Sequence, residues 1–329
     1  MSNKSKFLVF VIIYVGPWPP WLKLFLATCK SNPHIDFLFL SDTLIEPAET
    51  LPANVKNIQM DADDIKKRFE TGLDMELPVV DGRKIPDLRP FCGLGFHEFI
   101  EEYQFWGYCD IDLLWGDLSW ALNPEALANV DVFSPSVQHC VGHCTILRNN
   151  EEMNLLCRSI PDYKERALVR ESTFMDETGI TTVIKSRPEI RYLHPKDVLE
   201  EMKNDKAMVG ISTWDCRGLT GQRNNPGYLF HWDGKRGILK TRQTSCEIMY
   251  LHFLSLKQKL FWFFYNDKKD YASFYMSGLG FIPKEYKLLL HNLIVDRSGT
   301  LLIDLVRAAK RRSQPVKRTS WDGWDKMGQ

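Results

Sequence analysis

The segment that most constrains the fold is residues 7–15, a nearly uninterrupted run of β-branched, aliphatic and aromatic residues. A run of this length and composition is typical of a central strand in a parallel sheet, which is buried on both faces. Residues 21–29 have helical spacing, and residues 35–40 form a second apolar run. This strand–helix–strand order predicts a right-handed crossover between parallel strands, and hence an α/β fold.

The same first run could instead be the apolar core of a signal peptide, because Lys4 and Lys6 precede it. Its length of about nine residues is well short of the roughly 20 needed to span a bilayer. Three prolines (Pro17, Pro19 and Pro20) follow where a small-residue cleavage site would be expected. We therefore expect a buried first strand, and we expect no other segment to span a membrane.

Charge and cysteine content narrow the class of protein. Lys plus Arg and Asp plus Glu each total 42, so no global electrostatic field draws the chain to nucleic acid. The eight cysteines are scattered without a disulfide framework, which indicates a reduced chain and a cytoplasmic location. A length of 329 residues is ample for one large domain or two intimate ones.

The ends of the first two strands carry residues suited to a ligand site. Ligands of open parallel sheets bind beyond the carboxyl ends of the strands. Tyr14, Val15 and Gly16 follow from the first strand, and Asp42 follows the second. We expect these four residues to face a nucleotide. Asp42 could alternatively serve only in a turn or helix cap, for which Ser-Asp-Thr is a favourable sequence.

Two aspartates, Asp110 and Asp112, follow another apolar strand at residues 105–109. Unpaired buried carboxylates are energetically costly, so such a pair usually meets a cation. The hard ions Mg²⁺ and Mn²⁺ prefer carboxylate oxygens and keep coordination positions open for substrate phosphates. The motif therefore predicts a site for Mn²⁺ or Mg²⁺.

A strand followed by Asp-x-Asp is similar to the pattern of metal-dependent nucleotide-sugar glycosyltransferases of the GT-A fold. The longer run, from Lys84-Ile-Pro-Asp-Leu-Arg-Pro90 to Asp112, resembles a bacterial family of surface-polysaccharide glycosyltransferases, the DUF6625 group. The resemblance extends from about Phe7 to about Lys257. It implies a GT-A-like fold with a Rossmann-type central mixed sheet flanked by helices.

The resemblance also implies an activity. A hexosyltransferase would move a sugar from a nucleotide-sugar donor, such as a UDP-sugar, to a glycan or lipid-linked acceptor. The setting would be capsule or O-antigen assembly in the cytoplasm, at the inner face of the plasma membrane. Paired aspartates also fit a metal-dependent nucleotidyl- or phosphotransferase, and aromatic loops fit a non-catalytic glycan-binding protein.

Residues around the acidic motif acquire roles from the same resemblance. Lys84, Asp87 and Arg89 would lie beside the donor, where Arg89 suits a bidentate phosphate contact and Asp87 a ribose or base. Asp87 and Arg89 could alternatively only brace each other at a helix start. Ile111, between the two aspartates, is expected to belong to the same nucleotide-sugar site.

Gly142 and His143 precede a strand and, by the resemblance, would line the donor sugar or acceptor. The set of His139, Cys140, His143 and Cys144 also has the spacing of a zinc knuckle. No second ligand cluster lies nearby in the sequence, so the donor-site interpretation is favoured.

His252 ends an apolar strand at residues 247–252, and Lys257 follows five residues later. In the enzymes that the chain resembles, a histidine in this position completes the metal shell and the basic residue after it holds the diphosphate. The alternative for His252 is a satisfied histidine in the core.

Asp176 and Glu177 resemble the acidic pair that opens a helix across the acceptor cleft in many GT-A enzymes. One of them, Asp176 by preference, would act as general base on the acceptor hydroxyl if the enzyme inverts, at a distance from the donor diphosphate. The alternative is that Thr173 or Asp176 only caps a helix over residues 180–184.

The expected domain organisation is a glycosyltransferase domain at 1–258, with a donor side at 1–118 and an acceptor side at 119–258. Residues 259–329 would form an aromatic and basic extension. Such an extension suits contact with anionic lipid headgroups, or it is a solvated chain end.

Overall fold

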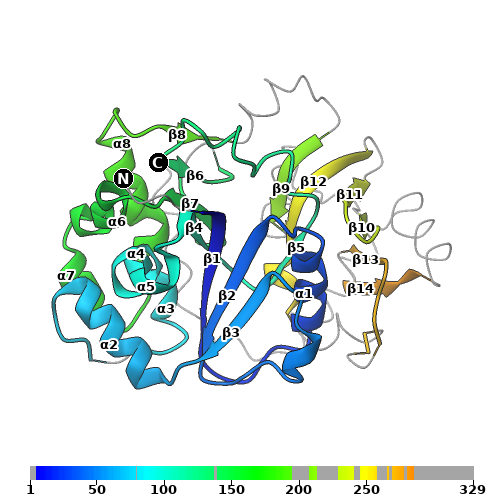
Figure 1. The fold of residues 1–329 in the computed structure, drawn as a ribbon, viewed down its shortest axis with the longest axis horizontal. Coiled ribbons are helices and arrows are strands. Elements are labelled where there is room, and N and C mark those ends of the chain that lie inside the picture. Colours follow the sequence, from blue (N-terminus) through cyan, green and yellow to red (C-terminus); the bar gives the residue numbers. More distant parts are fainter. Residues whose placement is uncertain are drawn as a thin grey trace, which may run out of the picture.

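Two β-sheets and a set of short helices make up the protein (Figure 1). This computed structural model describes residues 5–78, 80–136, 139–194, 207–212 (backbone only), 229–240, 245–257, 265–266, 269–277 and 280–284. Expectations about other residues, including most of the extension at 259–329, lie outside the described part of the chain.

The first sheet is built around β1 and has the strand order β3-β2-β1-β4-β7-β6-β8. Its strands are β1 (Lys6–Tyr14), β2 (Ile35–Ser41), β3 (Val55–Gln59), β4 (Tyr103–Cys109), β6 (Val132–Phe133), β7 (Cys144–Arg148) and β8 (Tyr192–Leu193). β1 runs parallel to both β2 and β4, whereas β7 is antiparallel to β4. The strands predicted at residues 7–15, 35–40 and 105–109 are therefore confirmed as β1, β2 and β4, and the predicted mixed α/β class is confirmed as well. β3 was not predicted.

The second sheet has the order β14-β13-β10-β11-β12-β5, and β9 pairs in parallel with β12. Its strands are β5 (Leu113–Trp115), β9 (Ala207–Ser212), β10 (Leu229–Trp232), β11 (Gly237–Lys240), β12 (Ser245–His252), β13 (Phe274–Ser277) and β14 (Gly280–Pro283). β13 pairs with β10, so the boundary expected after residue 258 falls inside this sheet.

Helices lie on both sides of the first sheet (Figure 1). α1 (Leu22–Lys30) lies on the side of the second sheet. The helices on the other side are α2 (Ala62–Leu73), α3 (Ile85–Leu88), α4 (Cys92–Gly95), α5 (His97–Ile100), α6 (Glu151–Leu155), α7 (Tyr163–Leu168) and α8 (Ile180–Lys185). Within the described residues, none of the helices combines the length and the apolar character that a membrane span requires.

The core shows why β1 is apolar without interruption. Val9 and Val11 pack into the cluster that holds Phe69 of α2, whereas Phe10 packs into the cluster that holds Phe25 of α1 and Trp115 of β5. Successive residues of a strand point to opposite faces, so a strand covered on both sides must be apolar at every position. Residues 7–14 therefore form a central strand, as predicted, and the carboxyl ends of β1 and β4 meet at one edge of the sheet.

Candidate functional site

The two aspartates lie where the chain crosses from the first sheet to the second. Asp110 follows the last residue of β4, and Asp112 precedes β5. β5 pairs antiparallel with β12, and the first residue of β5, Leu113, is opposite His252. The amide of Phe253 also donates to the carbonyl of Asp112 at 3.0 Å. Strand pairing therefore brings His252 beside two carboxylates that precede it by about 140 residues in the chain.

Asp110, Asp112 and His252 form a group that could hold a metal ion, as their ligand atoms all lie within 4.8 Å of one another. His252 Nε2 is 3.7 Å from Asp110 Oδ2 and 3.3 Å from Asp112 Oδ2. Two atoms bound to one Mg²⁺ at roughly 2.1 Å can be at most about 4.2 Å apart, and both separations meet this limit. Among the described residues this is the only such group. His252 is therefore close enough to each aspartate to share a divalent ion with it.

The residues around Asp112 keep its side chain ionised. Burial opposes its ionisation, but His252 and Lys257 together lower the pKa of Asp112 well below its usual range. Lys257 Nζ lies 2.7 Å from Asp112 Oδ2. Burial lowers the pKa of His252, but the carboxylate of Asp112 outweighs this effect and raises it above its ordinary value. A metal ion would therefore compete with a proton for His252, and the competition would grow stronger as the pH falls.

His143 lies against the same group. Its ring stacks on that of His252 with centroids 4.3 Å apart, and its Nε2 is 3.0 Å from the hydroxyl of Tyr250. The carbonyl of His143 accepts from the amide of Asp110 at 3.2 Å. Burial and the neighbouring His252 lower the pKa of His143 well below its ordinary value, so this ring is neutral. The structure thus brings a predicted sugar-site residue next to the predicted metal ligands.

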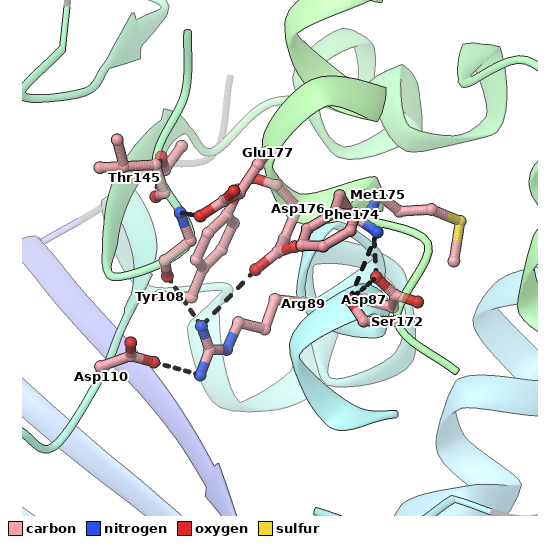
Figure 2. Close-up of polar contacts among 12 residues, drawn as sticks. Asp87, Arg89, Tyr108, Asp110, Thr145, Ser172, Phe174, Met175, Asp176 and Glu177 are labelled. Atoms are coloured by element: carbon pink, nitrogen blue, oxygen red, sulfur yellow. Dashed lines mark hydrogen bonds and ion pairs between the residues drawn. The ribbon is translucent and has the colours of Figure 1, made fainter. Parts of the chain in front are cut away.

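Arg89 connects the first aspartate to a later loop (Figure 2). Its Nη2 lies 2.5 Å from Asp110 Oδ1, and its Nη1 donates to the carbonyl of Gly142 at 2.8 Å. Nη1 is also 3.7 Å from Asp176 Oδ2. Burial opposes the charge of Arg89, but the carboxylates of Asp110 and Asp176 raise its pKa. A permanently charged guanidinium therefore lies between the metal group and the acidic pair.

Asp176 and Glu177 lie on a π-helical turn, Met175–Gly179, whose preceding residue is Phe174 with φ of 56°. The left-handed conformation costs a residue with a side chain about 1–2 kcal/mol, so the surroundings must hold this turn in place. The residue at the cap position is Phe174, which makes no side-chain capping bond. The cap position of α8, which covers the residues of the predicted helix, is Gly179. Neither Thr173 nor Asp176 therefore caps that helix.

The acidic pair is closer to Arg89 than the sequence indicates. The amide of Gly142 donates to Glu177 Oε1 at 3.2 Å, and a Cβ atom on Gly142 would lie only 2.4 Å from Asp176 Oδ2. Burial raises the pKa of Asp176 well above its usual range, although Arg89 opposes the effect. The pair thus lies close to Arg89 (Figure 2) and to the backbone of Gly142.

The residues at the ends of β1 and β2 are bonded to each other. The carboxylate of Asp42 accepts from the amide of Gly16 at 2.9 and 3.1 Å, and Gly16 has φ of 111°, where glycine is favoured. Tyr14 donates its hydroxyl to the carbonyl of Pro17 and stacks on Trp18. Burial raises the pKa of Tyr14, and Lys257 opposes this. These residues and Lys257 therefore share one edge of the molecule.

Lys84 and Asp87 have protein partners. Lys84 Nζ lies 3.0 Å from Asp87 Oδ2, and Asp87 accepts further hydrogen bonds from residues 172–175. Asp87 pairs with Lys84, whereas Arg89 pairs with Asp110. The alternative in which Asp87 and Arg89 only brace each other is therefore not what the described residues show. Ile111 and Val15 are half-buried and pack against the two sides of the core.

Tyr250 is a site residue that the sequence did not single out. Its hydroxyl bonds His143, and its ring lies edge-on to Trp115. Tyr250 and His252 are two residues apart on β12 and therefore point to the same face. This alternation is the signal that could have identified Tyr250 once His252 was chosen.

Comparisons with known proteins give one family and several distant structural likenesses. A model of a family of unknown function, DUF6625, matches residues 10–285. No curated protein matches the chain.

Three of the similar solved structures are glycosyltransferases. The glycosyltransferase GlyE of Streptococcus pneumoniae is 12% identical over 61% of this chain and 50% of its own length, with a TM-score of 0.34. The galactosyltransferase LgtC, in complex with donor and acceptor sugar analogues, is 12% identical over 64% and 78%, with a TM-score of 0.37. Mouse xyloside xylosyltransferase 1 is 11% identical over 75% and 97%, with a TM-score of 0.33. Likeness at these TM-scores is too low to establish what this chain does.

Proposed function

The chain belongs to the DUF6625 family of unknown function, and we propose that it is a metal-dependent glycosyltransferase of the GT-A type that uses a nucleotide-sugar donor. The observation that carries the proposal is the group of Asp110, Asp112 and His252 at the carboxyl end of β4. Its two carboxylates are each bonded to a cation, Asp110 to Arg89 and Asp112 to Lys257. Carboxylates and an imidazole suit Mn²⁺ or Mg²⁺, and fixed cations beside them suit a diphosphate.

The side chains of Lys257 and Arg89 differ in how freely they can move toward a bound diphosphate. A bound Mn²⁺ or Mg²⁺ would neutralise charge on the departing nucleoside diphosphate. The side chain of Lys257 is 43% exposed, so it can turn from Asp112 to a phosphate oxygen. Arg89 is held by Asp110 and by the carbonyl of Gly142, so it would fix the first aspartate and add positive charge from that position.

We assign the nucleotide of a UDP-sugar or similar donor to the edge that holds Tyr14, Val15, Gly16 and Asp42, with Ile111 beside it. The support is that these residues follow β1 and β2, where ligands of parallel sheets bind, and that Lys257 acts electrostatically on Tyr14. Gly142 and His143 would face the donor sugar, because His143 stacks on His252 and Gly142 contacts Arg89.

Asp176 or Glu177 would act as the base on the acceptor hydroxyl in an inverting reaction. A carboxyl with a raised pKa is suited to accept a proton near neutral pH, and burial raises the pKa of Asp176. Glu177 is less buried and bonds the amide of Gly142, so it is better suited to orient the loop. We therefore prefer Asp176 as the base.

The acceptor and the cellular setting rest on the family resemblance alone. A glycan or lipid-linked acceptor, in capsule or O-antigen assembly at the cytoplasmic face of the membrane, would receive the sugar. The donor side would be residues 1–118 and the acceptor side residues 119–258, with a basic and aromatic segment near the chain end contacting lipid.

A panel of nucleotide sugars with Mn²⁺ tests the proposal, with release of nucleoside diphosphate and free sugar as the readout. We expect Mn²⁺-dependent turnover that Asp112→Asn reduces to background while the far-ultraviolet circular dichroism stays unchanged. Asp117→Asn is the matched control, because Asp117 pairs with Lys235 away from the metal group. Full activity of Asp112→Asn, or in EDTA, would contradict the proposal. Phosphate release would point to phosphotransfer, and metal-independent glycan binding without turnover would point to a binding protein.

A further inference from the structure

A buried ion pair lies behind the site, between α3 and the residues that precede the acidic pair. The side chains of Lys84 and Asp87 are 1% and 0% exposed, and Lys84 Nζ lies 3.0 Å from Asp87 Oδ2. Lys84 Nζ also donates to the carbonyl of Arg166 at 2.7 Å. Lysine and aspartate are almost never buried to this extent unless they are paired, so this position has a specific requirement for both charges.

The carboxylate of Asp87 is fully engaged by one segment of the chain. Its Oδ2 accepts from the amide and the hydroxyl of Thr173 at 2.7 and 2.9 Å, in addition to Lys84. Its Oδ1 accepts from the amide of Met175 and the hydroxyl of Ser172, both at 3.2 Å. A carboxylate offers about four lone-pair sites, so these five donors leave no capacity for a substrate.

The segment held by Asp87 leads directly into the acidic pair (Figure 2). Thr173 and Met175 flank Phe174, whose φ of 56° turns the chain into the π-helical turn. That turn carries Asp176 to 3.7 Å from Arg89 and Glu177 to the amide of Gly142. Fixing the amides on both sides of a strained residue fixes where the next carboxylates point.

We infer that Lys84 and Asp87 are positioning residues, which hold residues 172–175 so that Asp176 faces Arg89 and Glu177 faces the amide of Gly142. Neither side chain contacts substrate in this arrangement. The expected effect on the reaction rate rests on the proposed function, whereas the expected effect on the ordering of residues 172–175 does not. Misplacing a reacting group by about 1 Å can reduce a rate by about 10²-fold, which sets the size of the expected effect.

Asp87 should contribute more than Lys84 to holding residues 172–175 in place. Asp87→Asn presents an NH₂ group to donors on residues 172–175 and leaves Lys84 buried without its carboxylate. Lys84→Met removes one of five donors and leaves the other four in place. The double variant Asp87→Asn/Lys84→Met should therefore show no more exchange at residues 172–179 than Asp87→Asn alone, since the second change removes the unpaired cation.

Hydrogen exchange of the amides in residues 172–179 is the primary measurement, in full-length protein. We expect Asp87→Asn to raise exchange in this segment by at least about tenfold, while the affinity for Mn²⁺ with UDP changes less than threefold, because Asp110 keeps its bond to Arg89. If a donor is turned over, kcat should fall about 10²-fold with little change in the KM for donor. Lys84→Met should show smaller changes of the same kind.

Asp131→Asn is the matched control. Asp131 is a buried carboxylate whose ion pairs, within the described residues, are with Arg191 and Arg148 and not with residues 172–179. It should lower the melting temperature without raising exchange at residues 172–179. If Asp87→Asn does not fold, Thr173→Val provides the test, because it removes one donor at 2.9 Å with little change of shape.

Unchanged exchange at residues 172–179 in both Asp87→Asn and Thr173→Val would overturn the inference. Equal exchange changes in Asp131→Asn would also overturn it, since the effect would then be a general loss of stability. Failure to find any donor would count against the proposed function only, because the exchange and Mn²⁺–UDP measurements do not depend on turnover.

Discussion

Asp112 and Asp176 are both buried, yet their surroundings shift their pKa values in opposite directions. Asp112 is next to His252 and Lys257, whose charges overcome burial and keep the carboxylate ionised. Within the described residues, Asp176 pairs with Arg89 at 3.7 Å, and that guanidinium is bonded more closely to Asp110. Burial therefore prevails and raises the pKa of Asp176. Two carboxyl groups with opposite shifts are suited to different tasks, one as a metal ligand and one as a proton acceptor.

Asp176→Asn should lower the rate and raise the stability. As base, the group acts only when unprotonated, so the wild-type rate should rise with pH through its raised pKa, and its loss should reduce kcat by about 10²–10⁴-fold. Between the ordinary carboxyl pKa and this raised value, the folded protein binds a proton that the unfolded chain releases. The contribution of Asp176 to the free energy of unfolding therefore falls as pH rises, and asparagine removes this penalty.

Melting temperature and initial rate, each measured from pH 5 to 8, test this expectation. Glu177→Gln is the control, because Glu177 is less buried and should change neither the pH profile nor the stability in the same way. A variant Asp176→Asn with a normal rate and a lowered melting temperature would show that the group is structural.

At the residue level, the sequence indicated which side chains could bind a metal, but it did not indicate which residues pack against Lys84 and Asp87. Asp110, Asp112 and His252 were predicted as ligands, and the structure brings them together. Lys84 and Asp87 were predicted beside the donor, but a motif does not reveal that residues about 86 positions later pack onto it. Which residues contact such a motif depends on tertiary packing, and the local sequence does not indicate it.

The elements that carry the acidic pair and Gly142 are short and fit together closely. A Cβ atom on Gly142 would lie 2.4 Å from Asp176 Oδ2 and 3.3 Å from Glu177 Oε1. The obstructing atoms are the ends of side chains, which can move, so the fold can accept a methyl group there. With a methyl group at residue 142, however, the carboxylate of Asp176 would have to move from its present position. The sequence predicted that a strand follows Gly142, but it could not predict the π-helical turn opposite, because such turns are rare and depend on tertiary support.

Gly142→Ala should therefore reduce turnover by about 10²-fold, the effect expected of a 1 Å displacement of a reacting group. The free energy of unfolding should change by less than about 1 kcal/mol, because the nearest obstructing atoms belong to side-chain carboxylates and not to the backbone. Gly82→Ala is the control, since nothing lies within 4 Å of its Cβ position. Denaturant unfolding and donor hydrolysis measure the two effects, and a fully active Gly142→Ala would refute the close fit.

The metal group belongs to the whole molecule rather than to one sheet. Asp110 follows β4, which runs parallel to β1 in the first sheet, and β5 takes the chain into the second sheet within three residues. His252 reaches the group only because β12 pairs with β5. Asn32, beyond α1, strengthens the junction by bonding the carbonyl of Gly116 and the amide of Leu118. Local patterns predicted β4 and β12 but not β5, and the pairing of strands so distant in the chain requires the folded core.

The second sheet is completed by strands that lie beyond residue 258, so a chain truncated there should lose the metal group. β13 and β14 contribute Phe274, Met276 and Phe281, which are buried in the cluster that also holds Leu251 of β12. Losing three such side chains at roughly 2–5 kcal/mol each removes about as much as the 5–15 kcal/mol that stabilises a typical domain. We expect residues 1–258 to show no cooperative thermal transition and no Mn²⁺-dependent binding of UDP. A chain ending at residue 285, where the family match ends, retains both strands and should keep both properties. Calorimetry of the two truncated chains decides the matter: tight binding by residues 1–258 would mean that the domain ends at 258, as the composition indicated, and that β13 and β14 are an addition to it.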